Sequence, residues 1–154
     1  MGYQTVKTIF FVITFGIGAI IGFYMFLPET PFMHAVMQYN DHSFPVLVAD
    51  TNATRSRGLS GRTALDPYAG MVFVFQHNAV RQFWMKDMRF PLDVLWIRKN
   101  EVVGLARGVA PYTPEGEITR FRSEKAVDMV VETYAGFIEQ NGLKMGDRIE
   151  LLTE

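Results

Sequence analysis

The strongest constraint in this sequence is an uncharged apolar run near its beginning, at residues 9–27. Its 19 residues read IFFVITFGIGAIIGFYMFL. As an α-helix this run would be roughly 28 Å long, which is close to the thickness of the hydrocarbon core of a bilayer. Because a lipid-embedded segment must satisfy its backbone polar groups internally, we expect one transmembrane helix that anchors the protein.

Two other interpretations of this run are open at this point. A cleaved signal peptide would have a shorter apolar core and small residues at its cleavage site. Residues 28–35 read PETPFMHA and offer no such site. A buried core helix without a polar face would need a large protein around it. The sequence therefore favours a retained signal anchor.

The charges on either side of the run predict its orientation. Lys7 and the terminal amine precede it, while the first lysine or arginine after it is Arg55. Positive residues stay on the cytoplasmic side, so we expect the N-terminus inside and the chain from about residue 30 outside. The prediction is a single-pass protein of the cytoplasmic (inner) membrane, with a C-terminal domain that is periplasmic or extracellular.

We divide the chain into an anchor at residues 1–27, a Pro-containing tether at 28–43 and a domain at 44–154. Without the anchor, the chain has 14 Lys plus Arg (the 15 of the whole chain minus Lys7) against 16 Asp plus Glu, a net charge of −2. This balance argues against nucleic acid as a partner. The chain has no cysteine, which excludes disulfides, thiol nucleophiles and thiolate metal sites.

The domain alternates short apolar segments with turn residues, a pattern typical of β-strands. Strands are expected at residues 46–49, 71–75, 83–86, 92–98, 101–107, 126–132 and 148–152. Lys99 and Asn100 predict a tight turn that joins two of these strands in a hairpin. Short helices are expected at residues 52–57 and 134–141, each followed by a glycine. The pattern predicts a mainly β fold of the α+β class: a small antiparallel β-barrel or sandwich with two short helices.

Several short motifs are spread along the domain. They are Arg57-Gly58-Leu59 with Arg62, Gly70-Met71 with Phe73, Phe83-Trp84-Met85-Lys86, Met88, Pro91-Leu92-Asp93, Ala135-Gly136 and Gly146-Asp147. With these motifs, the stretch from about Val46 to Leu151 resembles a bacterial and archaeal family known as domain of unknown function 192. The resemblance implies a compact, mainly β fold, often preceded by an export or anchor segment. It implies no established activity, so no residue roles carry over.

Trp84 and Lys86 form the first candidate ligand-binding pair. On a strand, residues two apart share a face, so these two side chains would point away from Phe83 and Met85. The pair could form a rim where a flat or anionic ligand stacks. The alternative is that Trp84 packs in the protein while Lys86 extends to water.

Asp93 is the second candidate, because it lies inside an otherwise apolar strand. A buried carboxylate is costly unless it accepts hydrogen bonds or pairs with a cation. Lys86, Arg62 or Arg57 could supply that cation. Asp93 would then be either a general base or ligand-holding carboxylate, or a structural group satisfied by an ion pair or by backbone N–H groups.

Arg57 and Arg62, with Arg55 nearby, form the third candidate. Their forked donors match carboxylate and phosphate groups, although such a charge run can also be a solvated face.

The sequence contains no recognisable catalytic set, and this supports a binding or interaction module over an enzyme. The domain would bind a small ligand or an envelope protein. The alternative is a small hydrolase or transferase with Asp93 as base and Lys86 or Arg62 stabilising an oxyanion. A third hypothesis is a purely structural role in an envelope complex. We expect no cofactor and no metal, since the three histidines lack the spacing of a zinc site.

Overall fold

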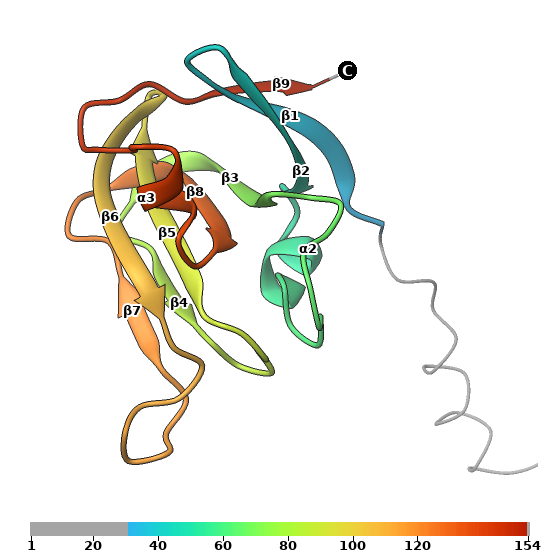
Figure 1. The fold of residues 1–154 in the computed structure, drawn as a ribbon, viewed down its shortest axis with the longest axis vertical. Helices are drawn as coiled ribbons and strands as arrows, with labels where there is room; N and C mark the ends of the chain where they lie inside the picture. The colour runs from blue at the N-terminus through green and yellow to red at the C-terminus, as the bar shows by residue number, and fades with distance from the viewer. Residues whose placement is uncertain (1–30, 154) are drawn as a thin grey trace, which may run out of the picture.

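The fold described here is that of residues 31–153 in a computed structural model, and it is mainly β (Figure 1). Its elements are β1 (Met33–Tyr39), β2 (His42–Ala49), α2 (Asn52–Arg57), β3 (Gly70–Ala79), β4 (Gln82–Trp84), β5 (Leu92–Arg98), β6 (Glu101–Val109), β7 (Arg120–Arg122), β8 (Val127–Tyr134), α3 (Phe137–Gln140) and β9 (Glu150–Thr153). The mainly β class and the two short helices confirm the sequence-based prediction.

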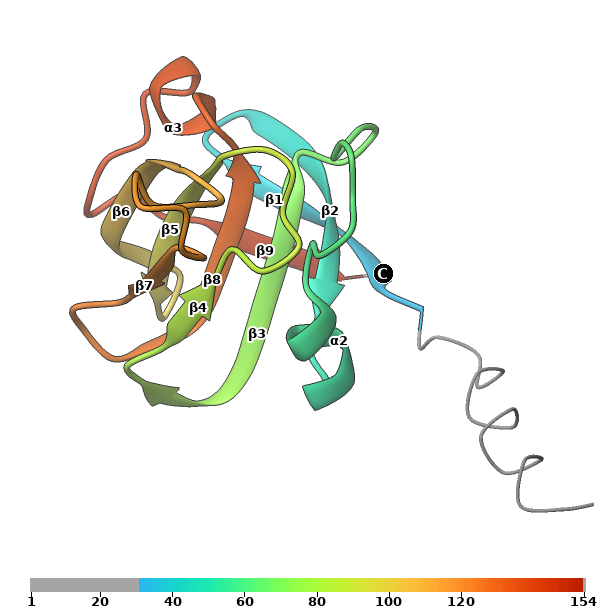
Figure 2. The same ribbon diagram turned by 90° about the horizontal axis from the view of Figure 1, so that it is seen from below.

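Seven strands form one curved sheet in the order β6-β5-β8-β3-β2-β1-β9, and β4 pairs with β7 in a separate two-stranded sheet (Figure 2). Neighbours in the large sheet are antiparallel except β2 and β3, which are parallel. Parallel neighbours need a crossover connection. Here the crossover is residues 50–69, which include α2.

The edge strands β6 and β9 approach each other without forming a ladder. Glu101, at the start of β6, makes an isolated antiparallel bridge with Arg148, just before β9. The backbone N–H of Val102 donates to the carbonyl of Asp147 at 2.8 Å. The prediction of an antiparallel barrel or sandwich is therefore wrong in its detail, because the large sheet is mixed and open. Short alternating strands look alike in sequence whichever way they pair, so the pattern could not reveal the parallel step.

The expected tether at 28–43 needs a correction as well, since β1 occupies residues 33–39. Alternate residues of β1 are buried, with Met37 fully so, and β1 pairs with both β2 and β9. Asn40, with a φ of 50°, lies in the turn between β1 and β2. The first strand of the sheet thus begins at residue 33, about ten residues before the predicted start of the domain.

The apolar run at residues 9–27 lies outside the described residues. Within residues 31–153, no helix is both long enough and apolar enough to cross a membrane.

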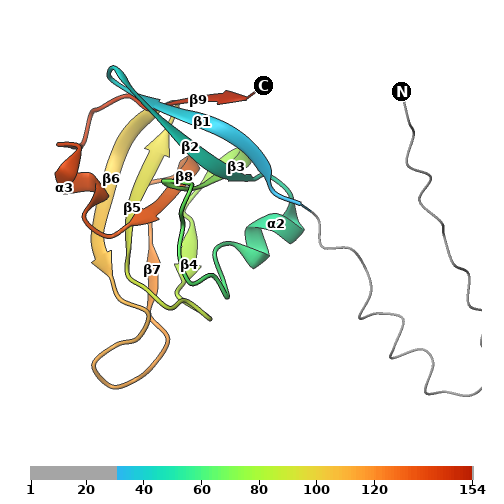
Figure 3. The ribbon, with the colours of Figure 1, turned by 45° about the vertical axis from the view of Figure 1, so that its right-hand side comes forward.

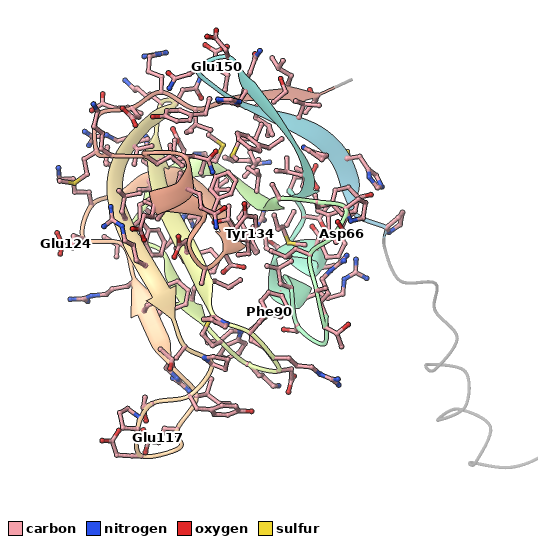
Figure 4. All side chains as sticks on the ribbon, in the orientation of Figure 1. Asp66, Phe90, Glu117, Glu124, Tyr134 and Glu150 are labelled. Carbon is pink, nitrogen blue, oxygen red and sulfur yellow. The ribbon has the colours of Figure 1, made fainter. Side chains whose placement is uncertain are left out.

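The middle strands β5 and β8 of the large sheet are buried on both faces, and each face has its own core. Figure 4 shows side chains on both sides of these strands. Along β5, Leu95 and Ile97 belong to the core that contains Phe137 and Ile138 of α3. The residues that alternate with them along β5, Val94 and Trp96, belong to the core beside α2 and β4. Because successive side chains of a strand point to opposite faces, these two cores define two separate environments for polar residues in the same strands.

Local signals predicted several elements correctly. Thr51 caps α2, accepting a hydrogen bond from the backbone of Thr54, and Gly58 follows the helix with a φ of 50°. Lys99 and Asn100, both with positive φ, form the turn of the β5–β6 hairpin, as expected. The second helix, α3, is only four residues long and lies within the longer range predicted.

Candidate functional site

Asp93 proves to be a structural carboxylate. Its side chain is 1% exposed. One carboxylate oxygen accepts a hydrogen bond from the backbone N–H of Gly108 at 2.8 Å. The other accepts from the N–H groups of Gly136 and Ile138, each at 3.0 Å. Asp93 thereby caps the first turn of α3 and ties β5 to the end of β6.

Asp93 also lies on the wrong face of the sheet for the predicted site. It shares the α3 face with Leu95 and Ile97, whereas Trp84 lies on β4, on the α2 side. The structure therefore does not bring Asp93 together with Lys86 or Arg62 around one pocket, and the hydrolase or transferase hypothesis loses its base.

Arg57 and Arg62 converge, but on a residue of the chain itself. The guanidinium carbon of Arg57 lies 4.0 Å from the ring centroid of Phe32, and that of Arg62 lies 5.8 Å from the same centroid. All three residues line a hollow of about 540 Å³ next to Gly58. These contacts hold the segment that precedes β1 against the end of α2.

Trp84 and Lys86 lie near each other, but β4 ends at Trp84 and Lys86 lies in the turn that follows, so the strand predicted at residues 83–86 is shorter than expected. Trp84 is 52% exposed, and the ammonium of Lys86 lies 5.8 Å from its ring centroid. Phe83 points the other way and packs edge-on against Phe73, while Met85 is buried. Trp84 lines a groove and Lys86 does not.

This groove has a volume of about 590 Å³ and is lined by residues of α2, β3 and the β4–β7 sheet. Figure 3 shows the elements that carry these residues. Three arginines line the groove, Arg55 from α2, Arg81 from the turn before β4 and Arg120 from β7. Aromatic and other side chains complete the lining: Asn52, Ser56, Phe73, Phe75, Val80, Gln82, Phe83 and Trp84. The groove is thus basic and aromatic at once.

The arginines of the groove are held in place by backbone and ring contacts. Arg55 donates to the carbonyl of Val74 at 2.9 Å and to the side chain of Asn52 at 2.6 Å. The guanidinium carbons of Arg55 and Arg81 lie 5.2 Å and 3.9 Å from the ring centroid of Phe75. These contacts fix two positive charges close to each other.

Electrostatic strain is visible at Arg81. Burial, and then the positive charge of Arg55, lower the pKa of its guanidinium. Its Nε is buried and has no hydrogen-bond partner in the part of the chain that the structure describes. An anion between these two guanidinium groups would reduce their repulsion, because opposite charges favour the charged form of each.

Glu132 is the residue that sequence reasoning missed. It lies in β8, opposite Met71 of β3 and Val94 of β5, which are both fully buried. The strands are so close here that a Cβ on Gly70 would lie 2.1 Å from the carbonyl oxygen of Glu132, which is why only glycine fits. The side chain of Glu132 is 4% exposed, and burial raises the pKa of its carboxyl to about 8.

The carboxyl of Glu132 makes no hydrogen bond or ion pair with any residue from 31 to 153. It lines a narrow pocket of about 30 Å³. This pocket and the groove share five lining residues, which are Arg55, Ser56, Phe73, Phe83 and Trp84. The two hollows are therefore neighbours, with arginines around the wide one and a buried carboxyl beside the narrow one.

A signal for Glu132 does exist in the sequence. It lies in the run AVDMVVETY, where the predicted strand ended at residue 132 and the observed strand continues to Tyr134. A carboxylate inside a strand is unusual, and this is why Asp93 was selected. Glu132 was predicted to end its strand, where a carboxylate is common, so it was not selected.

Comparison with known proteins gives a family and a fold. The profile of the family DUF192, described as Uncharacterized ACR, matches residues 35–151. A crystal structure from Sinorhizobium meliloti 1021, described provisionally as a transcription regulator, is 26% identical, with a TM-score of 0.67 over 79% of this chain and 94% of that one. A protein of unknown function from Novosphingobium aromaticivorans DSM 12444 is 25% identical, with a TM-score of 0.66 over 77% of this chain and 84% of that one. No curated protein matches the chain.

Proposed function

The chain belongs to the uncharacterised DUF192 family, and we propose that its domain is a ligand-binding module that holds a small organic anion in the groove beside α2. The observation that carries this proposal is the set of three arginines around one aromatic-lined groove of about 590 Å³. Ligand pockets of this size typically combine apolar walls with a few polar groups that fix the orientation of the ligand.

Each part of the groove has a role in this proposal. Arg55, Arg81 and Arg120 would bind the anionic group with charge-assisted hydrogen bonds. Trp84, which is 52% exposed, offers a flat surface on which an aromatic or planar body can stack. The aromatic contacts of Phe83 with Phe73, Trp96 and Phe121 support this wall from behind.

Binding of phenyl phosphate, measured by titration calorimetry on the full chain in detergent micelles, tests the proposal. We expect binding of phenyl phosphate, weaker binding of inorganic phosphate, and about tenfold weaker binding of phenyl phosphate after Arg81→Gln, because one charge-assisted hydrogen bond to the anion is lost. The matched control is Arg98→Gln, which changes an exposed arginine at the end of β5 and should leave the affinity unchanged. Equal affinities for all three proteins, or no binding at all, would contradict the proposal.

We also propose that the module is held on the outer face of the cytoplasmic membrane by residues 9–27. The support is the uncharged apolar run, which is long enough to cross a bilayer, with Lys7 before it.

Fractionation of a Gram-negative host that produces the full chain tests the anchor. The chain should remain in the membrane fraction after washing with alkaline carbonate, and deletion of residues 9–27 should release it. Protease added to spheroplasts should digest the domain. Recovery of the protein in the soluble fraction, with its first thirty residues intact, would refute the anchor.

A further inference from the structure

The narrow pocket beside the groove is lined by a carboxyl group, that of Glu132, which makes no hydrogen bond with any residue from 31 to 153. Buried polar groups in proteins are nearly always hydrogen-bonded, and each exception calls for an explanation. Glu132 is 4% exposed, and its carboxyl has no partner within residues 31–153. Around it, Met71, Phe73 and Leu92 form an apolar layer. By contrast, the equally buried Asp93 accepts three backbone hydrogen bonds.

The surroundings of Glu132 limit the kind of group that can satisfy it. Arg55 and Arg57 line the same narrow pocket, so a further cation, such as a ligand ammonium group, would be repelled there. A carboxyl that keeps its proton donates one hydrogen bond and accepts others. Its best complement is a neutral group that both accepts and donates, such as a carboxamide or a hydroxyl.

The size of the pocket also limits the group. The space beside Glu132 is about 30 Å³, whereas the neighbouring groove has about 590 Å³. The flat body and the anionic group of a ligand therefore fit only in the groove. The narrow pocket shares five lining residues with the groove and has room for a single small substituent.

The geometry points to a bifunctional ligand, in which a flat body carries an anionic group on one side and one small neutral donor–acceptor group on the other. The anionic group lies in the groove, and the neutral group hydrogen-bonds with the carboxyl of Glu132 in the narrow pocket. This assignment rests on the proposed function, because the arginines must hold the anionic group for the other end to reach inward. Glu132 is then the specificity-determining residue, since a ligand without the neutral group leaves its carboxyl unpaired. Sites built to hydrogen-bond a ligand group discriminate strongly against analogues that lack it.

Matched aryl phosphates test this inference on the full chain in detergent micelles. The probes are phenyl phosphate and its meta- and para-carbamoyl derivatives, and the readout is the ratio of their dissociation constants within each protein. In the wild type we expect the better carbamoyl isomer to bind at least about tenfold more tightly than phenyl phosphate. Glu132→Gln, which can still donate and accept, should keep most of this advantage, and Glu132→Met should abolish it.

Glu150→Met is the control variant, because it makes the same change at an exposed glutamate of β9. It should keep the wild-type ratio. Thermal unfolding of each variant shows that it is folded, and Glu132→Gln gives the test a second, nearly isosteric variant. A ratio near one in the wild type, with phenyl phosphate bound, would overturn the inner subsite and leave the anion-binding proposal standing. A carbamoyl advantage that persists in Glu132→Met would also overturn it. Absence of binding by any aryl phosphate would instead refute the proposed function itself.

Discussion

Asp93→Ala is expected to lower the free energy of unfolding by about 4 kcal/mol, since it removes the acceptor of three backbone hydrogen bonds in a buried site. The N–H groups of Gly108, Gly136 and Ile138 all donate to its carboxylate at 2.8–3.0 Å. Each N–H left without a partner costs about 1–3 kcal/mol, and hydrogen bonds to a charged acceptor are stronger than average. The methyl group of alanine also leaves a small cavity beside α3.

Urea unfolding, followed by tryptophan fluorescence, measures this effect. The buried Trp96, at 5% exposure, should report the loss of the core. Asp128→Ala is the matched control, because Asp128 also accepts from a backbone N–H, that of Lys99 at 3.1 Å, but at an exposed position. Its loss should cost less than about 1 kcal/mol, since water replaces the lost acceptor. Equal effects of the two substitutions would show that Asp93 is not the structural tie described above.

The elements that sequence reasoning predicted well are those determined by neighbours in the chain. Thr51 and Gly58 mark the ends of α2, and Lys99 and Asn100 mark the hairpin turn. The elements that it missed depend on distant partners. β1 is stabilised by β2 and by β9 from the opposite end of the chain, and the three-residue β7 exists because β4 pairs with it. Such strands have weak local signals, because their stability comes from the pairing.

The candidate site shows the same limit. The rule that a carboxylate inside an apolar strand is unusual selected Asp93, which is buried as expected but satisfied by backbone N–H groups. The same rule would have selected Glu132 if β8 had been predicted to continue to residue 134. Arg81 and Arg120 could not be joined to Arg55 from the sequence, because only the packing of the β4–β7 sheet near α2 brings the three together.

Glu132→Met is expected to stabilise the protein, in contrast to Asp93→Ala. Burial of a polar group without a hydrogen bond costs about 1–3 kcal/mol in protein mutational data, and methionine fills a similar volume without that cost. A substitution that stabilises the fold and abolishes ligand discrimination is the signature of a residue retained for function, because binding groups are often kept at the expense of stability.

This gain in unfolding free energy should depend on pH, because burial raises the pKa of the Glu132 carboxyl from its ordinary value of 4.5 to about 8 in the folded protein. Below pH 4.5 the carboxyl is protonated in both the folded and the unfolded chain, so its ionisation contributes no difference. Between pH 4.5 and 8 the unfolded chain releases the proton while the folded chain retains it, so wild-type stability falls by about 1.4 kcal/mol per pH unit. Above pH 8 both states are ionised and the loss stays constant.

The difference in unfolding free energy between Glu132→Met and the wild type isolates this group from the other titrating residues. It should rise steadily from pH 5 to pH 8, by an amount on the order of 4 kcal/mol, and then level off. Glu150→Met, at an exposed position, should show no such rise. A difference that is flat across this range would mean that the carboxyl of Glu132 ionises as easily in the folded protein as in the unfolded chain. It would then have a partner or solvent access that the narrow pocket does not provide, and the inner subsite would lose its neutral hydrogen-bond donor.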